Sequence, residues 1–129
     1  MSKNQKHVQV SMEEEIFVEI DPQRMARVFT NLLKNACYYS EGKMIKISTV
    51  NEEKQIHIIF ENEGNIPEEH LEHLFDKFYR MDEARQTRTG GAGLGLAISK
   101  EIVAAHQGTI AAECRSGIFD IIVTLPKTV

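Results

Sequence analysis

Apolar residues recur along the chain with two different spacings. In several short segments every second residue is apolar, which predicts strands that bury one face. These segments are 8–10, 16–20, 45–50, 56–60, 109–114 and 118–125. Polar residues 51–54 and 115–117 connect the last four segments in pairs, so we expect two hairpins.

A spacing of three and four residues predicts a long helix after the second of these segments. Asp21 can cap its first free N–H groups, and Pro22 suits the first helical position. The helix runs to about Tyr38 or Ser40, where a Ser-Glu-Gly sequence breaks it. Its apolar stripe consists of Met25, Val28, Phe29, Leu32, Leu33 and Ala36.

Two further helices are predicted in the second half of the chain. They cover about 68–75 and 93–106, and a polar, glycine-ended loop from about 81 to 91 lies between them. Strands in hairpins, with the helices segregated from them, indicate an α+β sandwich in which helices cover one sheet.

Composition narrows the class of protein. A length of 129 residues, 42% of them hydrophobic, fits one soluble globular domain. The net charge of −4 lacks the basic excess of a nucleic-acid binder, and no apolar run approaches the ~20 residues that span a bilayer. Cys37 and Cys114 are too few for a disulfide framework. We expect a reduced intracellular domain without a structural metal, in which both cysteines are small buried residues.

Asn31, Asn35 and Tyr38 border the apolar stripe of the first long helix. At ~100° per residue they lie within roughly 60° of one another. Two amide side chains one turn apart suit a hard cation and phosphate oxygens, because an Asn oxygen can complete a Mg²⁺ shell without adding negative charge beside a polyphosphate. Taken alone, ordinary solvent-facing helix positions explain the two Asn residues better.

Two glycine-containing segments have a similar ambiguity. In residues 61–67, Gly64 would let a flat ligand approach the backbone and Asn62 can read a base edge, although a plain turn is the simpler explanation. Residues 89–96 lead into the last long helix, whose N-terminal N–H groups suit an anion such as phosphate. This segment is neither a Walker A sequence nor GxGxxG in register, so by itself it is a weak signal.

The order and spacing of these segments resemble the catalytic, ATP-binding domain of bacterial sensor histidine kinases. Residues 31–40 resemble the N box of that family, 62–66 its first glycine box, 75–80 its F box and 91–96 its second glycine box. The resemblance extends over 16–125, nearly the whole chain.

The resemblance implies a fold and a narrower group. The fold is the Bergerat-type two-layer sandwich: one mixed, mostly antiparallel sheet covered on one face by about three helices, with a mobile ATP lid over 81–91. Residues 82–85 are similar to the vancomycin-resistance sensor kinases of Gram-positive bacteria. Residues 1–129 would then form a single ATP-binding catalytic domain.

The resemblance also implies which residues bind Mg-ATP. Asn35 would be the Mg²⁺ ligand, and Arg80 would be catalytic, neutralising charge as the γ-phosphoryl group leaves. Asn62 would accept a hydrogen bond from the adenine amino group, where the family usually has Asp, and Tyr39 would pack on the nucleotide. The implied nucleotide-binding residues are Asn31, Asn35, Tyr39, Asn62, Gly64, Ile66, Arg80, Gly91, Gly93, Leu94, Gly95 and Leu96.

The implied reaction transfers the γ-phosphoryl group to a histidine on a helical-hairpin dimerisation and phosphoacceptor domain. None of the five histidines has the flanking residues of a phosphoacceptor, so we expect that domain to be absent from residues 1–129. A response regulator would be an indirect partner, nucleic acid would not be one, and the isolated domain would be a monomer. It would form the cytoplasmic portion of a membrane-bound sensor.

Two departures from the family pattern leave alternatives open. Tyr38 stands where the family commonly has Lys, and Asn65 alone separates Gly64 from Ile66, so the first glycine box is one residue short. The alternatives are a degenerate nucleotide-binding or docking module with weak ATP affinity, and an anti-sigma-type serine kinase. The Phe-Tyr-Arg sequence of the F box favours a sensor kinase.

The histidines suggest lesser roles. His70 and His73 have metal-like spacing on a short helix but lack further ligands, so we expect a solvated face. His106 lies near the C-terminus of the last helix, where we expect it to cap the helix rather than act in catalysis.

Overall fold

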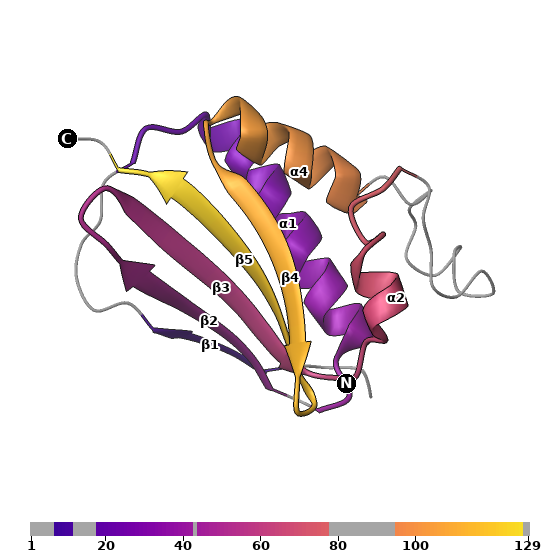
Figure 1. The fold of residues 1–129 in the computed structure, drawn as a ribbon. Helices are drawn as coiled ribbons and strands as arrows, with labels where there is room; N and C mark the ends of the chain where they lie inside the picture. The colour runs from indigo at the N-terminus through magenta and orange to yellow at the C-terminus, as the bar shows by residue number, and fades with distance from the viewer. Residues whose placement is uncertain (1–6, 12–17, 43, 78–94, 128–129) are drawn as a thin grey trace.

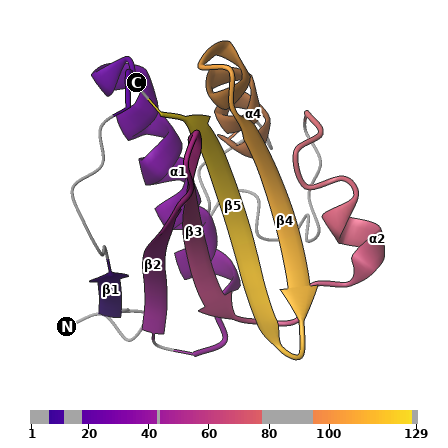
Figure 2. The ribbon, with the colours of Figure 1, turned by 60° about the vertical axis from the view of Figure 1, so that its left-hand side comes forward.

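The computed structural model describes residues 7–11, 18–42, 44–77 and 95–127. Helices α1 and α4 lie side by side on one face of a curved sheet, and α2 lies beside the edge strand β4 (Figures 1 and 2). The elements are β1 (His7–Ser11), α1 (Pro22–Tyr39), β2 (Met44–Asn51), β3 (Gln55–Glu63), α2 (Glu68–Leu71), α4 (Gly95–Ala105), β4 (Thr109–Arg115) and β5 (Ile118–Pro126).

The sheet has the strand order β1-β2-β3-β5-β4. β1 is parallel to β2, and the other three pairs are antiparallel. Phe60 of β3 is opposite Ile121 of β5, which is opposite Ala112 of β4, so these apolar residues form one row across the sheet. The predicted α+β fold, with a mixed and mostly antiparallel sheet, is confirmed.

The core lies between this face of the sheet and the helices. Every second residue of β5 is buried, which is the period of two that predicted the strand. From α1, four residues of the predicted stripe are buried, and Phe29 and Leu33 pack partly buried against the core. The buried residues of these two elements are Met25, Val28, Leu32, Ala36, Phe119, Ile121, Val123 and Leu125.

The predicted strand over 16–20 is wrong in its described part. Val18, Glu19 and Ile20 have no strand structure. Val18 packs against the core from irregular backbone, whereas Ile20 is 37% exposed. Residues 18–20 instead form a short irregular segment that leads into α1. Asp21 caps this helix, and its side chain accepts hydrogen bonds from two backbone N–H groups.

The predicted helix over 68–75 is shorter than expected. α2 ends at Leu71, and the chain continues in tighter turns, in which the N–H groups of His73 and Leu74 bond to carbonyl groups three residues earlier. α4 begins at Gly95, and the predicted first residues of this helix, 93–94, lie outside the described residues. Among the helices that the structure describes, none is long and apolar enough to cross a membrane.

Candidate nucleotide-binding site

Asn31 connects the middle of α1 to the first turn of α4. Its Nδ2 donates to the carbonyl oxygen of Gly95 at 3.2 Å and to Ser99 Oγ at 3.4 Å. Ser99 is fully buried, and its hydroxyl donates to the same Gly95 oxygen at 2.9 Å. Ser99 is not among the predicted site residues, and its signal in the sequence is a hydroxyl on the apolar side of a helix. These bonds fix the N-terminal end of α4, where the glycine-rich segment ends, against α1.

Asn35 lies one turn further along α1, on the same side as Asn31. Its Oδ1 atom is buried and has no hydrogen-bond partner among the described residues. Buried polar atoms are nearly always paired, and an unpaired one costs about 1–3 kcal/mol. The atom is therefore available to a ligand, which fits the predicted role of Asn35 but does not test it.

Asn62 is inside β3 rather than after it, and it is 3% exposed. It pairs with Ile45 on one side and with Phe119 on the other. Its Nδ2 donates to the carbonyl oxygen of Glu63 at 2.9 Å, which fixes the orientation of the amide. Because Nδ2 is the donor in this bond, the amide oxygen is the acceptor that the side chain can offer to a ligand.

Gly64 lies close to the end of α1. A Cβ atom at this position would be 3.0 Å from the carbonyl oxygen of Tyr39 and 3.2 Å from Nδ2 of Asn62, closer than nearly all side chains approach. The glycine is therefore required by this close approach. The Tyr39 ring is half-buried and packs edge-on against the Phe119 ring, with 6.4 Å between the ring centroids. Ile66 is 7% exposed and belongs to the core.

The structure thus brings some of the predicted site residues together. Asn31 hydrogen-bonds to Gly95, and Gly64 leaves no room for a side chain beside Asn62 and the carbonyl group of Tyr39. Leu96 is partly buried and packs against the core, so its contribution to a phosphate site would come from its backbone. Arg80, Gly91, Gly93, Leu94 and the lid over 81–91 lie outside the described residues.

The two cysteines differ from their expected burial. Cys37 on α1 is exposed, because it points away from the stripe that contains Ala36. Cys114 is partly buried, and its Sγ atom makes hydrogen bonds to the backbone of Gly64 and Ile66. The sequence signal for Cys114 was its place on the inward-facing side of β4, one strand from the predicted site.

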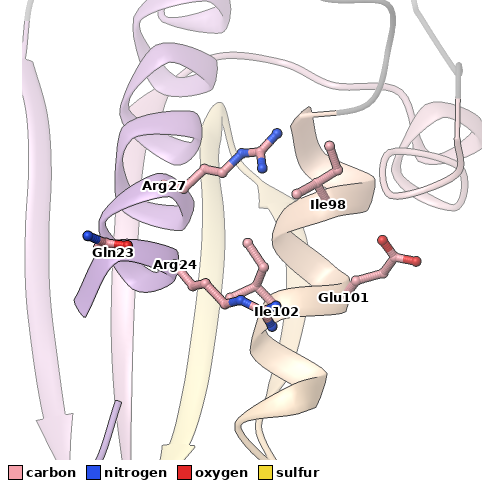
Figure 3. A pocket seen from close by; sticks show the side chains of 6 residues that line it. All are labelled: Gln23, Arg24, Arg27, Ile98, Glu101 and Ile102. Carbon is pink, nitrogen blue, oxygen red and sulfur yellow. The ribbon is translucent and has the colours of Figure 1, made fainter. Parts of the chain in front are cut away.

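A groove between the two long helices lies away from this site. It has a volume of about 430 Å³ and lies between α1 and α4, towards the N-terminus of α1 (Figure 3). It contains none of the predicted nucleotide-binding residues, and its lining carries both signs of charge. The lining residues are Gln23, Arg24, Arg27, Ile98, Glu101 and Ile102.

The carboxyl groups with clearly shifted pKa values also lie away from the site. Burial, followed by the neighbouring carboxylates Glu61 and Glu113, raises the pKa of Asp120. The three side chains are in one cross-strand row on the sheet face that the helices do not cover. Hydrogen bonds from Gln55 and His57 lower the pKa of Glu52, in the turn between β2 and β3.

His106 caps α4 as expected and also binds α1. Its Nδ1 atom lies 2.8 Å from the carbonyl oxygen of Ile102, and the backbone N–H of Asp21 donates to Nε2 at 2.9 Å. Because Nε2 accepts, the ring in this arrangement is neutral with its proton on Nδ1, rather than the imidazolium of a dipole interaction. His73 pairs with Asp76 at 2.8 Å, both exposed, consistent with a solvated face.

Among the described residues, the ligand offered to a metal at this site is the neutral amide oxygen of Asn35. Within the described residues there is no cluster of three His, Cys, Asp or Glu side chains that could hold an ion. The unpaired Oδ1 of Asn35 is the type of ligand that Mg²⁺ takes together with phosphate oxygens and water. The residues present therefore fit a nucleotide-bound Mg²⁺ ion.

The fold defines the chain as an α+β domain whose candidate site fits a nucleotide, and comparison with known proteins gives its family. Residues 20–129 match the family described as histidine kinase-, DNA gyrase B- and HSP90-like ATPase. The chain belongs to this family, and within it to the catalytic domains of sensor histidine kinases.

Similarities to individual proteins agree with this family assignment. The chain is 44% identical to the sensor protein VanS of Enterococcus faecium, over 98% of this chain and 33% of that protein. It is 45% identical to the sensor histidine kinase WalK of Bacillus subtilis, over 80% of this chain and 18% of that protein. The nucleotide-free catalytic domain of histidine kinase ThkA superposes with a TM-score of 0.80 at 30% identity, covering 98% of this chain and 82% of that one.

These relatives are sensor kinases, which favours the sensor-kinase interpretation over an anti-sigma-type kinase. The match to VanS also agrees with the predicted similarity to vancomycin-resistance sensors. The chain spans about a third or less of the curated relatives that it matches.

Proposed function

We propose that this domain binds ATP together with Mg²⁺ and transfers the γ-phosphoryl group to a histidine on the phosphoacceptor domain of its parent kinase. The observation that carries the proposal is the buried, unpaired Oδ1 of Asn35, one helical turn from the Asn31 side chain that anchors the start of α4. In a family of ATPases, an unpaired oxygen at this place is best explained by a ligand that supplies positive charge.

Asn35 would hold the Mg²⁺ ion, which supplies charge neutralisation to the phosphates when bound. Asn31 supports the phosphates indirectly, because its two hydrogen bonds place the first turn of α4 beside α1. The N–H groups of that turn, around Gly95 and Leu96, offer donors and positive potential to the phosphate oxygens.

Asn62 and Gly64 would recognise the base. The Asn62 amide is held by Glu63 so that its oxygen can accept a hydrogen bond from the adenine amino group. Gly64 lets the backbone pass close to Tyr39, and Ile66 contributes an apolar wall. Tyr39 would pack on the nucleotide from the end of α1.

The remaining roles are proposed from the family resemblance. Arg80 would neutralise charge on the leaving γ-phosphoryl group, and the backbone of Gly91, Gly93 and Leu94 would bind the polyphosphate. Residues 81–91 would close over ATP as a lid.

The domain would act as one part of a larger protein. The phosphoacceptor domain of the same kinase would be its direct partner and a response regulator an indirect one. We propose that the catalytic domain by itself is a monomer on the cytoplasmic side of a membrane-bound sensor.

The experiment is a transfer assay with γ-³²P-labelled ATP and the separately produced helical-hairpin domain of the parent kinase. Label should appear on the hairpin with Mg²⁺ present, should be lost when the hairpin histidine is replaced by Ala, and should fall strongly with Asn35→Ala. Persistent absence of label, with ATP binding retained, would instead favour a degenerate nucleotide-binding module, as Tyr38 and the short glycine box suggest.

A further inference from the structure

The loop of residues 64–66 follows β3 and is attached to two other parts of the fold. The N–H of Gly64 donates to the carbonyl oxygen of Gly117, in the turn between β4 and β5, at 2.9 Å. The N–H of Asn65 donates to a carboxylate oxygen of Glu41, after α1, at 3.4 Å. The position of this loop therefore depends on contacts that are distant in sequence.

A single thiol bridges the two ends of this loop. The N–H of Ile66 donates to Sγ of Cys114 at 3.4 Å, and the thiol donates to the carbonyl oxygen of Gly64, also at 3.4 Å. Cys114 is the second-to-last residue of β4. It packs against the core beside the buried Ile66. Acting as acceptor and donor together, the thiol determines the distance between two backbone groups that are two residues apart.

We propose that Cys114 is a positioning residue for the adenine pocket: its thiol holds the backbone of residues 64–66 so that Asn62 and Ile66 are correctly placed for the base. The inference rests on the proposed function, because it takes Asn62 and Gly64 as base-binding residues. Cys114 has no contact with the base in this account and acts through Gly64 and Ile66.

The chemistry of the thiol predicts how substitutions behave. Serine keeps a donor and an acceptor, although the shorter O–H bond requires the loop to move slightly towards β4. Valine fills a similar volume but removes both hydrogen bonds, leaving the buried Ile66 N–H unpaired and the loop free to shift. Serine should therefore preserve base recognition that valine weakens.

The test compares Cys114→Val and Cys114→Ser in the full chain, with Cys37→Val as the matched control at the exposed cysteine. Calorimetry gives the affinities for Mg-ATP and Mg-GTP, since guanine has a carbonyl group where adenine has the amino group that Asn62 would bind. Thermal unfolding is followed in parallel, and hydrogen exchange of the Ile66 amide is measured without nucleotide.

We expect Cys114→Val to lower the affinity for Mg-ATP about tenfold and to change the affinity for Mg-GTP little, so that discrimination between the two nucleotides falls. The same substitution should remove the protection of the Ile66 amide against hydrogen exchange. Cys114→Ser should stay within about threefold of the unmodified chain. If Cys114 had a purely structural role, Cys114→Val would lower the unfolding temperature and would lower the affinities for both nucleotides equally. That result would overturn the proposal.

Failure of the proposed function has a different signature. If the unmodified chain does not prefer ATP, or if Asn62→Ala leaves that preference unchanged, the base site itself is wrong. If Asn62→Ala removes the preference and a folded Cys114→Val chain keeps it, the inference about Cys114 is wrong alone. If Cys114→Val does not fold, Cys114→Ala with Cys114→Ser supplies the same comparison.

Discussion

The two ends of the α1–α4 helix pair are built differently. At one end the N–H of Asp21 donates to His106, and at the other the side chain of Asn31 donates to the carbonyl oxygen of Gly95. Both bonds join residues that are far apart in sequence, 85 positions in the first case and 64 in the second. At the Asp21 end both ring nitrogens of His106 have partners, whereas at the Asn31 end the neighbouring Oδ1 of Asn35 has none among the described residues.

This difference distinguishes a polar contact that stabilises the fold from a polar atom that is available to a ligand. A polar contact whose partners all belong to the chain stabilises the fold and leaves nothing for a ligand. A buried acceptor without a partner costs stability in the free protein, and that cost is recovered when a ligand supplies the missing charge or donor. The Asp21–His106 end should therefore respond to mutation through stability, and the Asn31–Asn35 end through nucleotide affinity.

The largest effect on stability is expected at Gly108, just beyond His106. A Cβ atom there would lie 2.3 Å from the carbonyl oxygen of Thr124 and within 3.0 Å of Leu125 and Val103, which are buried. Gly108→Ala should lower the free energy of unfolding by about 3 kcal/mol, at the upper end for overpacking, as measured by urea denaturation.

Gly42→Ala is the matched control for that substitution. Its Cβ would meet a carboxylate oxygen of Glu63 at 2.8 Å, but this is the end of an exposed side chain that can rotate away. An equal loss of stability in the two variants would contradict the account of Gly108.

His106→Ala should cost about 1 kcal/mol of stability, because two hydrogen bonds between neutral groups are lost near solvent. ATP affinity should not change, since none of the predicted site residues in the described part of the chain hydrogen-bonds to His106. Urea denaturation and calorimetry measure the two quantities. His73→Ala, which removes an exposed pair with Asp76, is the control and should have almost no effect on stability. A marked loss of ATP affinity in His106→Ala would break the distinction between the two ends.

Asp120 sharpens the comparison, because its Oδ1 is also buried without a partner in the described residues and yet lies away from the site. Its raised pKa means that the folded state binds the proton more tightly than the unfolded state. Stability from this group is therefore complete below the unfolded pKa and is lost as the pH rises through the folded pKa.

Asp120→Asn should accordingly stabilise the fold at pH 7 by a few tenths of a kcal/mol, up to about 1 kcal/mol, by removing repulsion within the acidic row. The gain should shrink as the pH falls towards about 4, where the aspartate becomes protonated in both states. Urea denaturation at several pH values measures it. ATP affinity should not change, because Asp120 lies on the sheet face that the helices do not cover. A clear loss would contradict the assignment of the site to the other face.

Much of the fold could be predicted from the sequence because its signals are local. The stripe from Met25 to Ala36 and the alternation in β5 each follow from the period of one element, and the Asp21 cap follows from two adjacent residues. The segment 16–20 has the same alternation without forming a strand in its described part, because nothing in the local pattern says whether a neighbouring strand is available to pair with it.

The site was predictable only in part for a related reason. The residue types at Asn35 and Asn62 suggested ligand chemistry, but their meaning depends on whether their oxygens find partners in the folded chain. The contacts of Ser99 and Cys114 join segments about 50 or more residues apart, and hydrogen bonds over such distances leave no periodic signal. Local chemistry therefore indicated the candidates, and tertiary structure shows which of them are unpaired.

We propose that Asn35, whose Oδ1 has no partner among the described residues, binds the Mg²⁺ ion of Mg-ATP. The most direct test of this proposal is calorimetric titration of the chain and of Asn35→Ala with ATP, with and without Mg²⁺, together with thermal unfolding and with Gln23→Ala on the same helix as the control. We predict that Mg²⁺ strengthens binding to the unmodified chain. Asn35→Ala should lower the affinity for Mg-ATP at least about tenfold, which corresponds to ~1.4 kcal/mol. Its unfolding temperature should stay the same or rise. Unchanged Mg-ATP affinity in Asn35→Ala, or a loss of stability in its place, would contradict the account.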